Sequence, residues 1–415
     1  MVKTTSTFLS TQQGTERLDS GSMRAQNLAL LLRLIWNEKE TSRADLARET
    51  GLSRSAASAL VDMLLKFGLI EEIGLGRSQR GRRPVLLRFV DDAFLVTGVD
   101  LGATHISVVV SNFRGEIKAS RTIQHDTRNQ PQSALKLVQK LVAEIQQETY
   151  SSQSKHLGIG VAVASPIHPD HPGCLSPIFW PEWRTIDLMK DLFPDLNESV
   201  LIGNDANLGA LAESWWGAGK GLDTLAFIKL GTGVGAGFII DHHIYKGHGG
   251  TAGEIGHLVI DPQGPKCVCG LNGCLATFVG TPALLQAIKH KQAEYPHSLL
   301  FDDDITLQNL IQAVKDGDLL AREIIKTSGQ YLGLAVAGLL NLMNPKLVVL
   351  GGEITKVGGV LLHALLECIQ SHSMWSTLAN SRVVLSELGE YDVALGAATL
   401  VIQSALEDPS RFPIQ

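Results

Sequence analysis

Hydrophobic residues in the first ninety positions recur mainly at helical spacing. Between residues 24 and 36, leucine and isoleucine side chains repeat every three or four positions, which predicts an amphipathic helix. Ser42 is suited to cap a second helix, and the turn at 51–53 ends with Ser53, a typical N-cap for a third helix that extends to about Phe67. Two helices joined by so short a turn predict a helix-turn-helix unit.

The third predicted helix carries short and guanidinium side chains near its start. Its apolar positions, among them Ala56, Leu60 and Leu64, are expected to face inward. The other residues near its start are therefore expected on or beside the exposed face, where they suit the edges of bases in a DNA groove. These candidate DNA-binding residues are Ser53, Arg54, Ser55, Ala57 and Ser58.

After the third helix, the pattern changes to that of strands. Segments 69–73 and 85–89 are predicted to pair as a hairpin whose tip is the glycine- and arginine-rich stretch 76–84. Arginines so close together repel one another, so their expected counter-charge is phosphate or a narrow minor groove. The alternative is a solvated basic loop on a small helical domain that contacts other proteins. The arginines of this predicted wing are Arg77, Arg80, Arg82 and Arg83.

Charge divides the 415-residue chain at about residue 90. Residues 1–90 contain 14 lysines and arginines against 9 acidic residues, whereas the remainder contains 22 against 33. A basic head on an acidic body predicts a polyanionic partner for the head. We expect a disordered tail at 1–22 and a winged helix-turn-helix DNA-binding domain at 23–92. The tail lacks the features of a secretory signal and no apolar run is long enough to span a membrane, so we expect a cytoplasmic protein without membrane insertion.

From residue 94 onward, strand-like runs alternate with helical patterns, which predicts an α/β body. The first run ends in Asp100-Leu-Gly102-Ala-Thr104, and a second strand at 106–110 completes a predicted hairpin. Such a turn can present backbone N–H groups and a hydroxyl to a phosphate, with Asp100 near a metal ion.

Two further glycine turns follow strands in the body. One lies between the apolar runs 225–228 and 238–240, and the other ends the run that starts at Leu347. Three glycine turns at strand ends favour a nucleotide cleft between two lobes. The candidate phosphate- or nucleotide-binding residues of the three turns are Asp100, Gly102, Thr104, Gly231, Thr232, Gly233, Gly235, Gly351 and Gly352.

Another strand end places a carboxylate between two amides, in the run 203–207. Asp205 in this run is suited to act as a general base toward a sugar hydroxyl. Asn204, Glu254 and His257 are candidates to hydrogen-bond the other hydroxyls. The sequence therefore predicts a sugar site that comprises Asn204, Asp205, Glu254 and His257.

His257 also begins a run with the spacing of metal ligands. Structural zinc prefers four nitrogen and sulfur ligands, and glycines in the run let the backbone wrap an ion. The candidate ligands are His257, Cys267, Cys269 and Cys274. A disulfide is the alternative, but three clustered cysteines leave one over, and the other two, Cys174 and Cys368, are remote in sequence. If one ring nitrogen of His257 holds zinc, the other is held in a fixed direction for the sugar site.

These motifs together resemble the ROK family (repressors, open reading frames and sugar kinases). With the head, they resemble its transcriptional repressors of the Mlc, NagC and XylR type, over nearly everything beyond residue 22. The most specific motifs are Gly253-Glu-Ile-Gly-His257 with the cysteine run, Asn204-Asp205-Ala-Asn207, Gly231-Thr-Gly-Val-Gly235, Asn344-Pro345 and Gly81-Arg-Arg-Pro84.

The resemblance implies an actin-like, or ribonuclease H-like, body whose two α/β lobes close around sugar and ATP. It implies a first lobe at 93–205, completed by a C-terminal helix at 393–406, and a second lobe with the zinc site at 206–392. Where the family has a glutamate that contacts the sugar, this chain has Ala276. Loss of a charged hydrogen-bond partner costs about 1.5–3 kcal/mol, so sugar affinity or identity is expected to differ. Segments 165–169 and 176–180 also depart from the family pattern.

The first hypothesis is a sugar-responsive repressor of carbohydrate genes. It would bind a palindromic operator as a homodimer or tetramer and respond to a small sugar or sugar phosphate. The second is an ATP-dependent sugar kinase in which Asp205 is the catalytic base and ATP with Mg²⁺ is the cofactor. The third is a scaffold that binds a transporter-component protein.

Overall fold

The computed structural model describes residues 20–77, 83–149, 155–194, 199–301 and 304–412, and it forms two compact units. One unit, the head, lies within residues 1–90 and includes the chain from Ser404 onward; the other, the body, spans 91–403. Most of the expected N-terminal tail lies outside the described residues, and its last three residues, 20–22, belong to the first helix. No helix among the described residues has both the length and the apolar character needed to cross a membrane.

The head combines three helices with a small antiparallel sheet. The strand β3 lies between β1 and β2 and pairs antiparallel with both. The elements are α1 (Ser20–Asn37), β1 (Thr41–Ser42), α2 (Arg43–Thr50), α3 (Arg54–Lys66), β2 (Ile70–Leu75) and β3 (Val85–Phe89).

Local hydrogen bonds fix the two helices of the predicted helix-turn-helix. The Ser42 hydroxyl accepts a hydrogen bond from the Asp45 N–H and caps α2, which ends at Gly51 in the left-handed conformation, with φ of 71°. The Ser53 hydroxyl accepts from the Ala56 N–H at 3.2 Å and caps α3. Both caps satisfy N–H groups that a helix start leaves unpaired. The predicted helices and their caps are confirmed.

The expected exposure of Ala57 is wrong. Ala57 is fully buried, whereas Ala56, expected to face inward, is exposed. The buried side of α3 is set by Ala57, Leu60, Val61 and Leu64, which repeat at i, i+3, i+4 and i+7 and therefore share one helix face. Ala57 thus contributes to the core of the head and presents no side chain to solvent.

The predicted wing is an antiparallel hairpin of β2 and β3. The Gly76 N–H donates to the Pro84 carbonyl at 2.8 Å and closes its base, where Arg77 and Arg83 are exposed. Arg80 and Arg82 lie outside the described residues, so their expected positions at the tip stay a prediction.

The body contains two five-stranded sheets of the same topology. In each, three strands form an antiparallel meander and two more continue the sheet in parallel with its first strand. The first sheet, in order β6-β5-β4-β7-β8, comprises β4 (Phe94–Leu101), β5 (His105–Ser111), β6 (Ile117–Gln124), β7 (Lys155–Val163) and β8 (Ser199–Asn204). The second, in order β11-β10-β9-β12-β13, comprises β9 (Leu225–Leu230), β10 (Val234–Ile240), β11 (His243–Ile244), β12 (Leu347–Gly351) and β13 (Arg382–Leu385).

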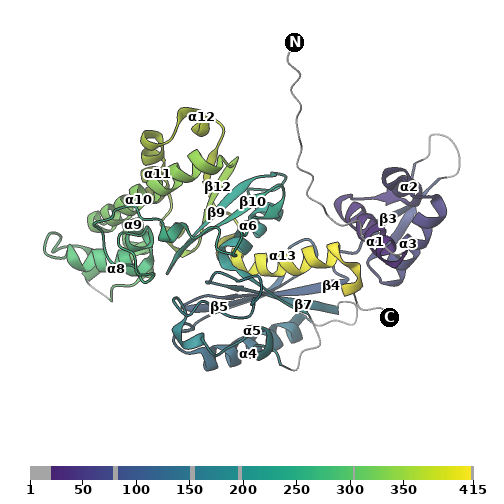
Figure 1. Cartoon of the computed structure of the whole chain (residues 1–415), viewed down its shortest axis with the longest axis horizontal. Coiled ribbons are helices and arrows are strands. Elements are labelled where there is room, and N and C mark those ends of the chain that lie inside the picture. Colours follow the sequence, from purple (N-terminus) through teal and green to yellow (C-terminus); the bar gives the residue numbers. More distant parts are fainter. Residues whose placement is uncertain (1–19, 78–82, 150–154, 195–198, 302–303, 413–415) are drawn as a thin grey trace, which may run out of the picture. The chain divides into compact units, whose positions relative to one another are not determined.

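Helices cover both sheets of the body. They are α4 (Pro131–Thr149), α5 (Leu188–Asp191), α6 (Asp205–Trp215), α7 (Ala276–Val279), α8 (Thr281–His290), α9 (Leu307–Asp316), α10 (Leu319–Met343), α11 (Gly359–His372), α12 (Trp375–Leu378) and α13 (Asp392–Glu407). Short 3₁₀ helices are η1 (Pro181–Trp183), η2 (Ile255–His257), η3 (Leu299–Phe301), η4 (Glu353–Val357), η5 (Gly389–Tyr391) and, in the head, η6 (Pro409–Arg411). Figure 1 shows α4 on one face of the first sheet and α13 on the opposite face.

Two glycines let α13 approach the first sheet at backbone distance. A Cβ added at Gly98 in β4 would lie 1.9 Å from the carbonyl oxygen of Ala394. A Cβ at Gly160 in the neighbouring strand β7 would lie equally close, at 1.9 Å, to that of Ala397. The helix therefore packs against these strands without intervening side chains, which accounts for the alanine-rich sequence of its first half.

We predict that Gly98→Ala destabilises the body. The added methyl group must displace the backbone of α13, and overpacking of this kind costs about 1–3 kcal/mol. The measurement is the midpoint of thermal unfolding by calorimetry. Gly338→Ala in α10 is the matched control, because a Cβ there meets no atom within 4 Å. It is expected to stabilise the helix by about 0.5–1 kcal/mol. Equal midpoints for the two variants would contradict this account of α13.

Candidate functional site

A cavity of about 620 Å³ in the body gathers most of the predicted site residues. Its size suits a small ligand. The walls come from the ends of β4, β8 and β9 and from the segment around η2. The predicted residues that line it are Asp100, Gly102, Thr104, Asn204, Asp205, Gly231, Thr232, Gly233, Gly235, Glu254, His257, Cys267 and Gly352. Gly351 is buried at the end of β12 and does not line the cavity, because the Phe227 ring and the Asp392 carboxylate fill the space beside it.

The first glycine turn holds a buried carboxylate and imidazole pair. Asp100, only 4% exposed, is the second-last residue of β4, and its Oδ2 lies 3.1 Å from Nε2 of His105. Gly102 permits this contact, because a Cβ there would lie 2.4 Å from the His105 ring. Burial alone would raise the pKa of Asp100, but the charges of Lys229 and His105 outweigh it and lower the pKa. The carboxylate is therefore ionised inside the protein.

Asn204 and Asp205 occupy the junction of β8 and α6. The Asn204 side-chain oxygen accepts from the Asn207 N–H at 3.0 Å and caps α6, while its amide donates to the Ser165 carbonyl and to Asp205 Oδ1, each at 3.2 Å. The same Oδ1 accepts from the Ala206 N–H at 2.8 Å. This end of the cavity is therefore held rigid by hydrogen bonds within the protein.

Lys229 lies beside Asp205, a neighbour that the sequence interpretation missed. Its Nζ donates to Asp205 Oδ2 at 2.7 Å, and both side chains are largely buried. Burial by itself would lower the pKa of Lys229, but the charges of Asp100 and Asp205 outweigh burial and raise it. The lysine is thus a permanent cation in the cavity wall.

Glu254 immediately precedes η2, and its side chain faces the cavity. Burial, with a smaller contribution from the charge of Asp205, raises the pKa of Glu254 to about 7. Its Oε2 lies 3.8 Å from Nε2 of His257, whose ring stacks on Phe179 with centroids 5.1 Å apart. Glu254 and His257 therefore form one polar wall, and Phe179 adds an aromatic surface.

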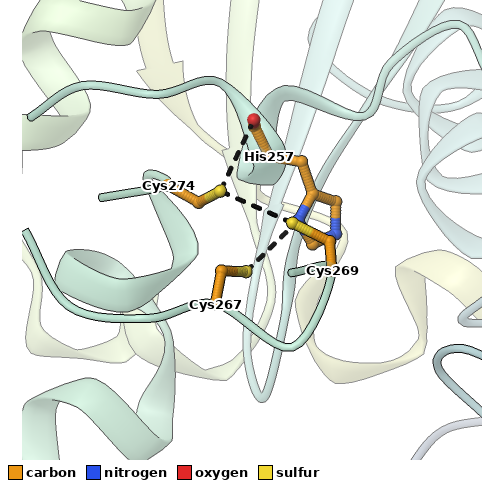
Figure 2. Close-up of side chains that lie close together, drawn as sticks. All are labelled: His257, Cys267, Cys269 and Cys274. Carbon is orange, nitrogen blue, oxygen red and sulfur yellow. Dashed lines mark hydrogen bonds between the residues drawn. The ribbon is translucent and has the colours of Figure 1, made fainter. Parts of the chain in front are cut away.

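The four predicted metal ligands come together beside this wall. Their donor atoms all lie within 4.8 Å of one another, and Figure 2 shows the side chains directed at a common centre. Cys269 Sγ lies 3.6 Å from Cys274 Sγ, and Cys267 Sγ lies 3.5 Å from His257 Nδ1. Burial and the neighbouring thiols raise the pKa of Cys274 to about 12, and burial lowers the pKa of His257. Cys267, Cys269 and Cys274 are all free thiols in the structure, so the disulfide alternative is wrong.

The segments that depart from the family pattern also line the cavity. Ser165 is buried, and its hydroxyl accepts from the Ser176 N–H at 3.0 Å, which joins segments 165–169 and 176–180. Phe179 from the second segment and Ala276 at the start of α7 both face the cavity. The alanine leaves space where a glutamate would project a carboxylate.

The head and the two-lobed body define a class of protein that joins a winged helix-turn-helix to a sugar-kinase-like fold. The family model described as ROK family matches residues 96–404, and the chain belongs to this family. It is 33% identical to a xylose repressor of Caldicellulosiruptor bescii over 388 residues, which are 92% of this chain and 97% of that protein.

Two solved structures resemble the model closely. One is a ROK family transcriptional regulator, described as a homologue of the E. coli Mlc protein, with a TM-score of 0.79 and 26% identity over 93% of this chain and 97% of that one. The other is a ROK family glucokinase from Streptomyces griseus in complex with glucose and AMPPNP, with a TM-score of 0.67 and 26% identity over 74% of this chain and 99% of that one. The expected fold class is confirmed.

Lys229, His105 and Asp392 line the cavity but were absent from the sequence interpretation. One feature of the sequence could have identified Lys229: it is a charged residue inside the apolar strand Leu225–Leu230, just before a glycine turn. No such feature could have identified Asp392, because it lies far along the chain at the start of α13, and only folding brings it to the cavity.

Proposed function

We propose that the protein is a sugar-responsive, DNA-binding transcriptional repressor of genes for carbohydrate uptake or metabolism. One observation carries the proposal: a helix-turn-helix head and a cavity with sugar-kinase architecture belong to the same chain. The regulator of known structure matches 93% of the chain, and the glucokinase only 74%. The similarity to a xylose repressor extends over nearly its whole length.

The head supplies the DNA contacts in this proposal. Ser53, Arg54 and Ser55 are exposed at the start of α3, the position from which a recognition helix contacts base edges in the major groove. Ser58 is half-buried and lies further along the helix. Arg77 and Arg83 at the base of the wing, with Arg80 and Arg82, would contact phosphates or the minor groove. Ala57 is left out because it is buried.

The body supplies the sugar site. Asp205, Glu254 and His257 face the cavity with hydrogen-bonding groups, and Phe179 offers a ring against which the apolar face of a sugar can pack. Ala276 removes one carboxylate from this site, so the ligand is a small sugar or sugar phosphate with fewer polar contacts there than a glucose-type ligand has in its relatives. Ligand binding would favour a closed body and so change operator affinity, because an effector shifts an equilibrium only by binding one state more tightly.

Repression requires two heads on one palindromic operator. A homodimer, or a tetramer, places two recognition helices at half-sites separated by whole helical turns. Closure of each body would then alter the separation of the paired heads. A transporter-component protein as a further partner has no surface assigned to it here.

The Cys₃His cluster is proposed to hold structural Zn²⁺. Tetrahedral zinc with Zn–S bonds of about 2.3 Å and Zn–N bonds of about 2.0–2.1 Å requires S–S and S–N separations of about 3.8 and 3.6 Å. The separations of 3.6 and 3.5 Å are close to these values. A bound Zn²⁺ stabilises the thiolate form of the crowded cysteines. Through His257 Nδ1 it would direct Nε2 toward the sugar.

A sugar kinase is the second candidate, favoured by one observation. The turn at Asp100, Gly102 and Thr104, the second glycine turn, and Asp205 all border the same cavity, as a nucleotide and a sugar would require. ATP with Mg²⁺ would then be the cofactor, and Asp205 would be the catalytic base.

We predict that the protein binds a palindromic site selected from genomic fragments and that Arg54→Ala weakens this binding by about 1–3 kcal/mol. Arg77→Ala should weaken binding to all DNA sequences alike and reduce the salt dependence of binding by about one released counter-ion. Fluorescence anisotropy at several salt concentrations measures both effects. Arg184→Ala, an exposed arginine of the body, is the control. If the protein selects no DNA fragment, the proposed function as a repressor is refuted.

We predict that one sugar of a panel of aldoses, N-acetyl sugars and their phosphates binds the protein and releases the operator. Glu254→Ala should abolish the heat of binding, because it removes a half-buried hydrogen-bonding group from the cavity wall. Calorimetry with zinc-loaded protein measures it, and Glu148→Ala on the surface of α4 is the control. Binding that survives in Glu254→Ala would place the sugar elsewhere.

We predict about one Zn²⁺ per wild-type chain and almost none in Cys274→Ala, because three remaining ligands hold zinc much less tightly. Elemental analysis by mass spectrometry gives the zinc content. Cys368→Ala is the matched control, since that cysteine lies on α11, outside the cluster. Equal zinc contents in the two variants would exclude the assigned site.

A further inference from the structure

Lys229 shares its surroundings with three carboxylates. Beyond Asp205, at 2.7 Å, the charges of Asp100 and Asp392 act on it, and both of these side chains are only 4% exposed. Within the described chain, Asp100 Oδ1 and Asp392 Oδ2 have no hydrogen-bond partner. Burial raises the pKa of Asp392 to about 7, although Lys229 opposes this rise. The ammonium group of Lys229, with the His105 ring beside Asp100, therefore counters a buried acidic cluster.

Carboxylates gathered in this way require a counter-cation. Burying an uncompensated charge is strongly destabilising, because the hydration that the charge loses is not replaced. In sites that bind Mg²⁺ with a nucleotide, one or two carboxylates and the phosphates surround the metal ion. Here the ammonium group of Lys229 already lies 2.7 Å from the carboxylate of Asp205, and the charges of Asp100 and Asp392 act on it.

Both carboxylate oxygens of Asp205 are also hydrogen-bonded within the protein. Its Oδ2 accepts from Lys229, and its Oδ1 accepts from the Ala206 N–H and the Asn204 amide. A carboxylate has about four acceptor positions, so three of them are occupied. A general base needs an oxygen within hydrogen-bond reach of the hydroxyl proton that it removes. The contacts of Asp205 hold its carboxylate in place and leave one acceptor position for a hydroxyl of the ligand.

We propose that Lys229 is the resident counter-cation of the cavity, which takes the place of a divalent metal ion and makes the body a sugar receptor without phosphoryl transfer. Lys229 is a positioning residue, because it acts through Asp205 and Asp100. The inference rests on the proposed function only in that a sugar is the ligand of the cavity.

The role of Lys229 is tested by titrating zinc-loaded full-length protein with Mn²⁺ and measuring the bound ion by electron paramagnetic resonance. Wild-type protein should bind no Mn²⁺ in the cavity. Lys229→Met keeps a long side chain and removes its charge. This variant should bind Mn²⁺ in the cavity at least about tenfold more tightly than the wild type does, a difference equivalent to 1.4 kcal/mol. Lys229→Arg keeps the charge and should gain no such site. Adding Asp100→Asn to Lys229→Met should abolish the gained site.

Three results would overturn the proposal. They are Mn²⁺ binding by the wild type that Asp100→Asn removes, a folded Lys229→Met variant without a gained site, and Mg²⁺-dependent nucleotide binding by the wild type that Lys229→Met abolishes. The last result would mean that Lys229 binds a phosphate group. If Lys229→Met does not fold, the wild type decides: sugar affinity that is independent of Mg²⁺ and ATP, without ADP release, supports the proposal, and ADP release refutes it.

Operator binding, measured on the same samples, separates this inference from the proposed function. Sugar-dependent release of the operator by wild-type protein in buffer without Mg²⁺ or nucleotide supports both. Operator release that requires Mg²⁺ and ATP would support the proposed function as a repressor and would contradict the proposed role of Lys229. A chain that binds no DNA leaves the Mn²⁺ result to decide the role of Lys229 by itself.

Discussion

The buried ion pair of Lys229 and Asp205 is the interaction on which the cavity depends. Asp100, Asp205 and Asp392 approach one another because the end of one strand and the starts of two helices meet in the body. Without a cation among them, mutual repulsion and lost hydration would oppose folding of this region. The lysine enters from β9, directly before the glycine turn, so the same strand positions the charge and the backbone loop.

Close backbone packing complements this electrostatic constraint. Gly98 and Gly160 bring α13 onto the first sheet, and the start of the same helix carries Asp392 to the cavity. Gly351 leaves room for the Asp392 carboxylate, whose Oδ2 lies 2.7 Å from the place of a Cβ at that glycine.

The Cys₃His cluster and the sugar wall are one structural unit. His257 directs Nδ1 toward Cys267 and Nε2 toward Glu254, and Phe179 stacks on its ring. Ala276 follows Cys274 by two residues and faces the same cavity. Any change in the cluster is thus transmitted to the polar wall over a distance of one side chain.

Patterns that depend on neighbours along the chain were determined by the sequence itself. The caps of Ser42 and Ser53, the hairpins at the glycine turns and the spacing of the four metal ligands are local, and they follow from backbone geometry and hydrogen bonding within a few residues. The exposure of Ala56 and Ala57 was assigned the wrong way round, because the helical period locates the stripe of buried residues only to within about one position.

Only the tertiary structure decided which charges meet. Asp100, Asp205, Lys229 and Asp392 are spread over almost three hundred residues of sequence, and no local pattern links them. Their interaction depends on how two sheets and α13 converge, since electrostatic energy is set by distance and burial and not by separation along the chain. The sequence by itself therefore determined the fold class and the candidate residues. The state of Asp205, which is paired with a lysine and accepts three hydrogen bonds within the protein, follows from long-range packing.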